Sequence, residues 1–443
     1  MGGLREELDG SADLAALGVG EAGERIRRGT LSPVALVEAC LERIRALDGT
    51  LEAWVHVDEK GALAVARERA RESARAAVRG PLHGIPFAVK DIFDVAGLPT
   101  TAGARAFAHR RPGEDAASVA LLRAAGAIVL GKTHTTQFAY RDPAPTRNPW
   151  NRAHTPGGSS SGSAAAVAAR MVPLALGSQT VGSVLRPAAY CGVVGFKPTH
   201  GLVSTTGVIP LAGSLDHVGV FTRGVADAGL VFSVLARQRV AVEPGNPPRL
   251  ALAPEVLRRA SREVAAHVQA TADAFARAGA TLTEVKLPRS FDGIHAAGQT
   301  VLESEAAAFH EPLFAKYADQ YGPEIRKLVE RGLTISAVTY LGANRARLAF
   351  REEVMEVLAA HDALLTPTAP TPAPEGLAST GDASLCAPWS FAGVPAISLP
   401  SGLTPSGLPL AIQLVQAAGA SARLLSVAAW CERQVAFTRS PGL

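Results

Sequence analysis

Two loops rich in serine and glycine carry the residues best suited to covalent chemistry. The first runs from Pro156 to Ser163 and enters a segment of small residues, 164–169, whose composition predicts a helix. A loop that feeds a helix exposes free N–H groups and the positive end of the helix dipole. Ser159 and Ser160 therefore lie where a reacting hydroxyl could be supported; the alternative interpretation is a flexible linker.

The second loop follows that helix and spans residues 177–187, with Ser183 near its end. Crowded small residues allow successive backbone N–H groups to face one point, which is what stabilisation of an oxyanion requires. An ordinary glycine-rich turn between a helix and a strand explains this segment alone equally well.

The first half of the chain must supply the elements that position these loops. Apolar residues three or four apart predict a helix over 34–48, and an Ala- and Arg-rich segment predicts another over 61–78. Residues 85–93 are β-branched and aromatic between two glycines, so they predict a strand that contains Lys90. A helical pattern over 116–125 and an apolar run over 127–130 then indicate a β-α-β unit.

The second half is predicted to return to the same sheet. A short strand over 249–252 precedes a mainly helical region over 255–360. Strand patterns at 396–400 and 410–414 and a closing helix over 423–435 follow. Because strand patterns flank the helical region, we expect one α/β domain over 1–443 whose central mixed β-sheet, flanked by helices, uses both ends of the chain.

Composition excludes several classes of protein. The chain has 443 residues, of which 47% are hydrophobic and 19% charged, which is typical of a globular protein with a large core. The net charge is +4, and the basic residues are scattered among acidic and apolar ones, so no nucleic-acid partner is expected. The first residues contain no apolar signal core and no run is long enough to span a membrane, which predicts a cytoplasmic protein.

Three segments together resemble the amidase signature family: Gly84 to Asp91, Pro156 to Ser163, and Gly177 to Pro187. The likeness extends from about residue 20 to the C-terminal helix, with a signature core over about 80–220. A match of three motifs in the right order is far more specific than any single loop. The resemblance implies the amidase signature fold and hydrolysis of a linear amide to a carboxylate and ammonia or an amine.

The resemblance also implies a role for each residue that matches the motifs. Lys90 would be the base, Ser159 the bridging serine and Ser183 the nucleophile that forms an acyl-enzyme. The Gly158–Ser159 peptide bond would be cis. The oxyanion hole would use the N–H groups of Thr180, Val181, Gly182 and Ser183. No metal and no other cofactor is implied.

A serine hydroxyl is a poor nucleophile until a base takes its proton, and Ser–Lys pairs perform this task in several enzymes. Lys90 can act as a base only when neutral, and burial in an apolar strand favours the neutral amine. The physical chemistry of these residue types therefore agrees with the implied roles.

Departures from the family pattern point to the substrate. Many members carry an Asp four residues before the nucleophile and an Arg two residues after it, where this chain has Gln179 and Leu185. Arg186 stands instead three residues after Ser183, as in a malonamidase-like branch in which this arginine reads a carboxylate on a small substrate. We therefore expect Arg186, Gly158 and Gln179 to bind the substrate; the alternative for Arg186 is a structural tie to a nearby carbonyl or carboxylate.

Two other functions stay open on the sequence alone. The family includes the glutamine-hydrolysing subunit of an amidotransferase, which passes ammonia to partner subunits. Gly158 to Gly162 also fits the G-x-S-x-G motif of α/β-hydrolases, with Ser160 as nucleophile, although the polar segment before it does not predict the required strand. The expected partner is a small-molecule amide, and a homodimer is common for such enzymes.

Overall fold

The computed structural model describes residues 13–443. The expectation that the chain starts without a signal segment concerns residues outside this range. An 11-stranded mixed sheet crosses the molecule in the order β1-β3-β2-β4-β6-β5-β10-β11-β9-β7-β8. Its strands are β1 (Trp54–Val57), β2 (Pro86–Lys90), β3 (Ile128–Thr133), β4 (Leu174–Gln179), β5 (Val194–Lys197), β6 (His217–Thr222), β7 (Arg249–Leu252), β8 (Thr281–Glu284), β9 (Ala363–Pro367), β10 (Ala396–Leu403) and β11 (Pro409–Val415).

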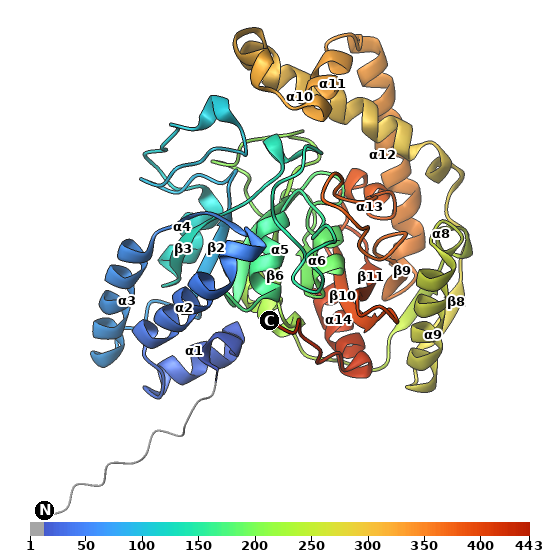
Figure 1. Ribbon diagram of the computed structural model, residues 1–443. Coiled ribbons are helices and arrows are strands. Elements are labelled where there is room, and N and C mark those ends of the chain that lie inside the picture. Colours follow the sequence, from blue (N-terminus) through green and yellow to red (C-terminus); the bar gives the residue numbers. More distant parts are fainter. Residues whose placement is uncertain (1–12) are drawn as a thin grey trace, which may run out of the picture.

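Helices cover this sheet and extend beyond it (Figure 1). They are α1 (Val19–Arg27), α2 (Pro33–Leu51), α3 (Glu59–Ala74), α4 (Ala117–Ala124), α5 (Ser161–Ala168), α6 (Leu185–Cys191), α7 (Val225–Leu235), α8 (Pro254–Leu257), α9 (Arg262–Arg277), α10 (Ile294–Tyr317), α11 (Pro323–Gly332), α12 (Ala337–Ala359), α13 (Ala387–Phe391) and α14 (Ser421–Val435). The described residues contain no helix long and apolar enough to cross a membrane.

The topology confirms the expected α/β class and the joint use of both ends of the chain. Strands β2 and β3 pair in parallel across α4, as the predicted β-α-β unit requires. Strand β10 pairs with β5 and with β11, so the C-terminal strands enter the sheet beside strands from the first half. One difference concerns the region 255–360, where β8 adds a parallel edge strand beside β7 instead of continuing the helical pattern.

The centre of the sheet is covered by two short helices that are buried along their whole length, α5 and α6. Helix α5 consists only of Ser, Gly, Ala and Val residues, and it packs against β2, β3 and β4. Small side chains bring its backbone close to these strands, and a Cβ at Gly162 would lie 2.1 Å from the carbonyl oxygen of Ala53. Helix α6 packs against β5, β10 and β11 instead. The serine loops that enter α5 and α6 therefore lie over neighbouring parts of one sheet.

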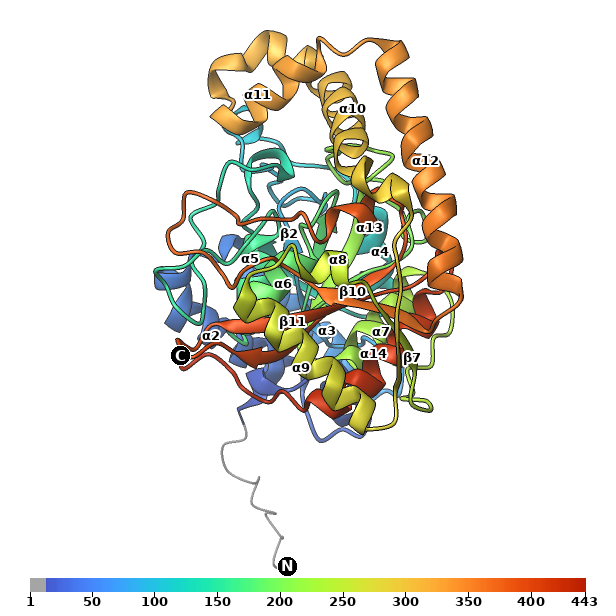
Figure 2. The same cartoon turned by 90° about the vertical axis from the view of Figure 1, so that its right-hand side faces the viewer.

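The helical region forms a separate layer above the body. In Figures 1 and 2, α10 and α11 rise at the top, and α12 runs back down beside the sheet. Leu302 of α10 and Glu324 of α11 face the cavity described below. The body and this layer therefore both contribute to the walls of one cavity.

A buried ion pair holds the end of β2. Lys132 of β3 and Asp91 have fully buried side chains, and Lys132 Nζ donates to Asp91 Oδ1 over 2.8 Å. The same ammonium donates to Pro99 O and Thr100 Oγ1, so all three of its protons are used. Because Asp91 follows Lys90 directly, this pair fixes the chain where β2 ends.

We expect Asp91→Ala to destabilise the protein by about 3 to 5 kcal/mol, because it leaves a buried ammonium without its counter-ion. Arg45→Ala, which removes an exposed ion pair with Glu59, should cost less than about 1 kcal/mol. The free energy of unfolding in urea measures both. Equal effects of the two substitutions would show that the buried pair does not anchor β2.

Candidate active site

Lys90 ends β2 and has no exposed surface. Its Nζ donates to Ser159 Oγ over 2.7 Å and to Ser178 Oγ over 2.8 Å. Burial holds the pKa of Lys90 well below its ordinary value, and the nearby charge of Asp216 opposes this effect only in part. No carboxylate forms an ion pair with Lys90 in residues 13–443. The site therefore favours a neutral amine that can accept a proton.

Ser159 lies two residues before the start of α5 and is also completely buried. The Gly158–Ser159 peptide bond is cis, as the resemblance implies. The amide N–H of the next residue, Ser160, donates to Ser183 O over 3.4 Å, which joins the two serine loops. Ser159 thus touches Lys90 on one side and belongs to the loop that contacts Ser183.

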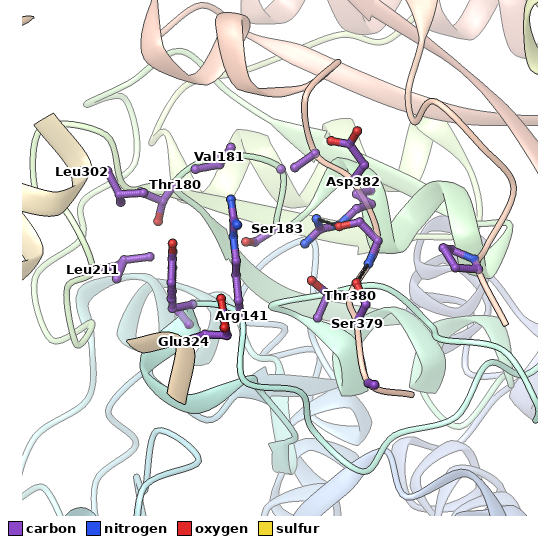
Figure 3. Close-up of a pocket in the computed structure, with 18 of the residues that line it drawn as sticks. Arg141, Thr180, Val181, Ser183, Leu211, Leu302, Glu324, Ser379, Thr380 and Asp382 are labelled. Carbon is purple, nitrogen blue, oxygen red and sulfur yellow. Dashed lines mark hydrogen bonds between the residues drawn. The ribbon is translucent and has the colours of Figure 1, made fainter. Parts of the chain in front are cut away.

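Ser183 lines a cavity of about 570 Å³ and retains 7% of its surface exposed (Figure 3). The hydrogen bonds of the described residues join Ser159 Oγ to Lys90 and include none between the hydroxyls of Ser159 and Ser183. Catalytic hydrogen bonds are often longer before a substrate binds. The structure therefore shows one half of the predicted relay as a direct contact.

The N–H groups of residues 180–183 have no acceptor within the part of the chain that the structure describes. All four residues lie between β4 and α6 and line the cavity. Thr180 Oγ1 donates to Asp216 Oδ1 over 2.5 Å, and Ser390 Oγ donates to Val181 O over 2.6 Å, so the loop is held from both sides. Unpaired amides at a fixed loop are suitable donors for a developing oxyanion.

Gln179 is buried and lies outside the cavity. Its Oε1 accepts hydrogen bonds from the N–H groups of Val184 and Leu185, and its Nε2 donates to Ser390 Oγ. The amide oxygen is therefore occupied by the start of α6, and the amide nitrogen is bonded to α13. Substrate binding by Gln179 was expected from the sequence, but these contacts make it a positioning residue for the loop of Ser183.

Arg186 lines the cavity, although its side chain is tied to two carbonyl groups. Nη2 donates to Gly158 O and Nη1 donates to Gly381 O, each over 2.6 Å. In the described residues no carboxylate pairs with this guanidinium, and burial lowers the pKa of Arg186. These contacts match the structural alternative for Arg186, and Gly158 is its partner rather than a residue on the cavity wall.

Sequence reasoning missed most of the remaining cavity wall. Arg141, Leu302, Glu324 and the segment 378–383 line it together with Ser183. They come from four separate parts of the chain and carry no local motif.

The geometry around Ser160 argues against the α/β-hydrolase interpretation. Ser160 is fully buried, and its hydroxyl donates to Ser178 O over 3.3 Å. The residues just before it form only an isolated bridge at His154 instead of a strand. A nucleophile elbow requires an exposed serine after a strand, so the required context is absent here.

Known proteins share the sequence pattern and the fold of this chain. The model of a family described as Amidase matches residues 35–425. A glutamyl-tRNA(Gln) amidotransferase subunit from Anaeromyxobacter sp. (strain K) is 36% identical, over 97% of this chain and 98% of the relative. A crystal structure of an amidase superposes with a TM-score of 0.89 at 34% identity, covering 94% of this chain and 100% of the other. Peptide amidase from Stenotrophomonas maltophilia gives 0.84 at 31% identity, covering 96% and 98%.

The sheet, the serine-lined cavity and these relatives define an enzyme that hydrolyses carbon–nitrogen bonds of amides. The chain belongs to the amidase signature family.

The contacts of Gln179 predict the effect of Gln179→Leu. The substitution leaves the N–H groups of Val184 and Leu185 buried without an acceptor, so the loop of Ser183 should shift. We expect kcat to fall by about tenfold or more with little change in KM. Steady-state kinetics measure this; an increase in KM at constant kcat would instead support direct substrate binding by Gln179.

Proposed function

We propose that the protein cleaves a linear amide through an acyl-enzyme on Ser183. Lys90 accepts the proton of Ser159, which accepts the proton of Ser183 as the Ser183 oxygen attacks the carbonyl carbon. The amides of residues 180–183 stabilise the negative oxygen of the tetrahedral intermediate. The proton then returns to the leaving nitrogen, the C–N bond breaks, and water attacks the ester to release a carboxylate and regenerate Ser183.

The observation that carries this proposal is the hydrogen bond of 2.7 Å between the buried Lys90 and Ser159, next to a loop of unpaired amides. A buried lysine without an ion pair is costly unless it is neutral, and such perturbed groups are concentrated at functional sites.

For the substrate, we propose a small amide that bears a carboxylate, as in the malonamidase-like branch. The cavity volume of about 570 Å³ suits a small molecule. Two arginines line this cavity, and a guanidinium group matches the geometry of a carboxylate. Arg186 already donates to two carbonyl groups, so Arg141 is the arginine suited to bind this carboxylate.

A second candidate is glutamine, hydrolysed to supply ammonia to partner subunits. The supporting observation is the relative named as one subunit of glutamyl-tRNA(Gln) amidotransferase, which matches this chain over nearly its whole length. Glutamine carries both a carboxylate and an ammonium group. The cavity offers Glu324 and Asp382 in addition to its two arginines, so both charges could find a partner.

We further propose that the protein acts in the cytoplasm, as a homodimer or with partner subunits. Exposed apolar side chains on α12, at Val338, Leu341 and Leu348, would suit such a contact. Their spacing of three and seven residues places them on one face of the helix.

The nucleophile is tested by ammonia release from the purified protein without partners, using a panel of acidic, aliphatic and aromatic amides and glutamine. Ser183→Ala and Lys90→Met should reduce kcat by about three orders of magnitude or more, whereas Ser160→Ala should keep measurable hydrolysis. A fluorophosphonate should label Ser183, as measured by peptide mass spectrometry. Loss of activity in Ser160→Ala together with labelling of Ser160 would reject the proposal.

The depressed pKa of Lys90 predicts a pH profile. A protonated Lys90 cannot accept a proton, so kcat/KM should be lost as pH falls through its pKa and should reach a plateau well below pH 10.5. Asp216 is a buried carboxyl whose charge acts on Lys90, and burial raises the pKa of Asp216 to about 6. The variant Asp216→Asn should keep the rise of kcat/KM with pH, because this rise comes from the loss of the Lys90 proton. A rate that rises only near pH 10.5 would show a solvated, charged lysine.

A further inference from the structure

We propose that Arg141 determines substrate specificity by binding an anionic group, a carboxylate, on the acyl part of the amide. This inference rests on the proposed function and assigns the recognition of the carboxylate to a residue outside the family motifs. Figure 3 shows the Arg141 side chain reaching into the cavity, with its guanidinium drawn between Thr180 and Ser183.

Four charged side chains line the cavity, and they differ in the contacts that they make. Arg186 donates to two carbonyl groups. Glu324 pairs with Lys327 over 3.2 Å, and Asp382 accepts the N–H of Ser384. Arg141 has neither a hydrogen bond nor an ion pair with any residue of 13–443, and its Cζ lies 5.4 Å from the ring centre of Tyr140. Its guanidinium is thus the cation that remains available to a ligand.

The loop that carries Arg141 is anchored on both sides of this residue. The loop 137–142 is closed by a hydrogen bond from Gln137 N to Asp142 O. The Asp142 carboxylate accepts the N–H groups of Glu324 and Ile325 at the start of α11. The side-chain amide of Gln137 binds Gln320 O and Gly322 N. Both flanks of Arg141 are therefore fixed to the helical layer while its own side chain is left unpaired.

Arg141 and Arg186 carry like charges that repel each other. Burial is the main cause that lowers the pKa of Arg186, and the positive charge of Arg141 acts in the same direction. An anion held at Arg141 would relieve this repulsion, whereas a neutral group would not. Glu324 and Asp382 disfavour an anion elsewhere on the wall, so they confine its position. The fork of Arg141 can also donate two parallel hydrogen bonds to a carboxylate.

The inference is tested with three charged amides and three neutral ones. The charged set is malonamate, succinamate and glutaramate, and each neutral partner carries an isopropyl group in place of the carboxylate. The readout is the ratio of kcat/KM between each charged amide and its partner. Arg141→Gln should lower this ratio by about ten- to a hundredfold, mainly through KM, because a charged hydrogen-bond partner is lost.

Two further variants distinguish recognition from a general effect. Arg141→Lys keeps the charge without the fork and should restore part of the ratio. Arg345→Gln removes an exposed arginine of α12 that does not line the cavity, and it should leave the ratio of the wild-type protein unchanged.

The outcomes also separate this inference from the proposed function. Labelling of Ser183 by a fluorophosphonate combined with a ratio that Arg141→Gln does not change overturns the role of Arg141 and leaves the function standing. Labelled protein that hydrolyses none of the charged amides also overturns it. Absence of labelling at Ser183 contradicts the proposed function itself.

Discussion

The burial of Lys90 at the end of β2 is the constraint on which the site depends. An ammonium in a dry interior is unfavourable, so the protein surrounds the Lys90 nitrogen with two hydroxyls, Ser159 and Ser178, and no carboxylate among the described residues. Strands β2 and β4 are parallel neighbours, so Lys90 and Ser178 lie next to each other at the carboxyl ends of these strands. The loop of Ser183 begins at the carboxyl end of β4, so the base and the nucleophile loop start from the same side of the sheet.

Nearby side chains hold the loops of the site in place by pairing with some of their backbone groups and not with others. Gln179 occupies the two amides after Ser183, while those of residues 180–183 are left unpaired. Arg186 pairs with carbonyl groups instead: it donates to Gly158 O and to Gly381 O and so joins these two loops. An interior that pairs most polar groups and leaves one row of donors unpaired makes that row a site for negative charge.

The cavity itself depends on segments that are distant in sequence. Arg141 follows β3, Glu324 opens α11, and Asp382 lies in the loop before α13. The helical layer of α10 to α12 is fixed to the body through Gln137 and Asp142, so changes in this layer would alter the substrate range without moving Lys90 or Ser159. The chemistry and the choice of substrate are therefore carried by different parts of the structure.

The sequence by itself determined the strand that contains Lys90, the two serine loops, the β-α-β unit and the family, because each rests on local residue order and spacing. It also indicated that both ends of the chain share one sheet. Only the tertiary structure decided what Gln179 and Arg186 contact, since their partners at Ser390 and Gly381 lie about two hundred residues away. The same holds for Arg141 and for the edge strand β8. An arginine or a glutamine can bind a ligand, hold a loop in place or face solvent, depending on which groups the fold packs against it. Local sequence order does not specify those groups, because they come from distant parts of the chain.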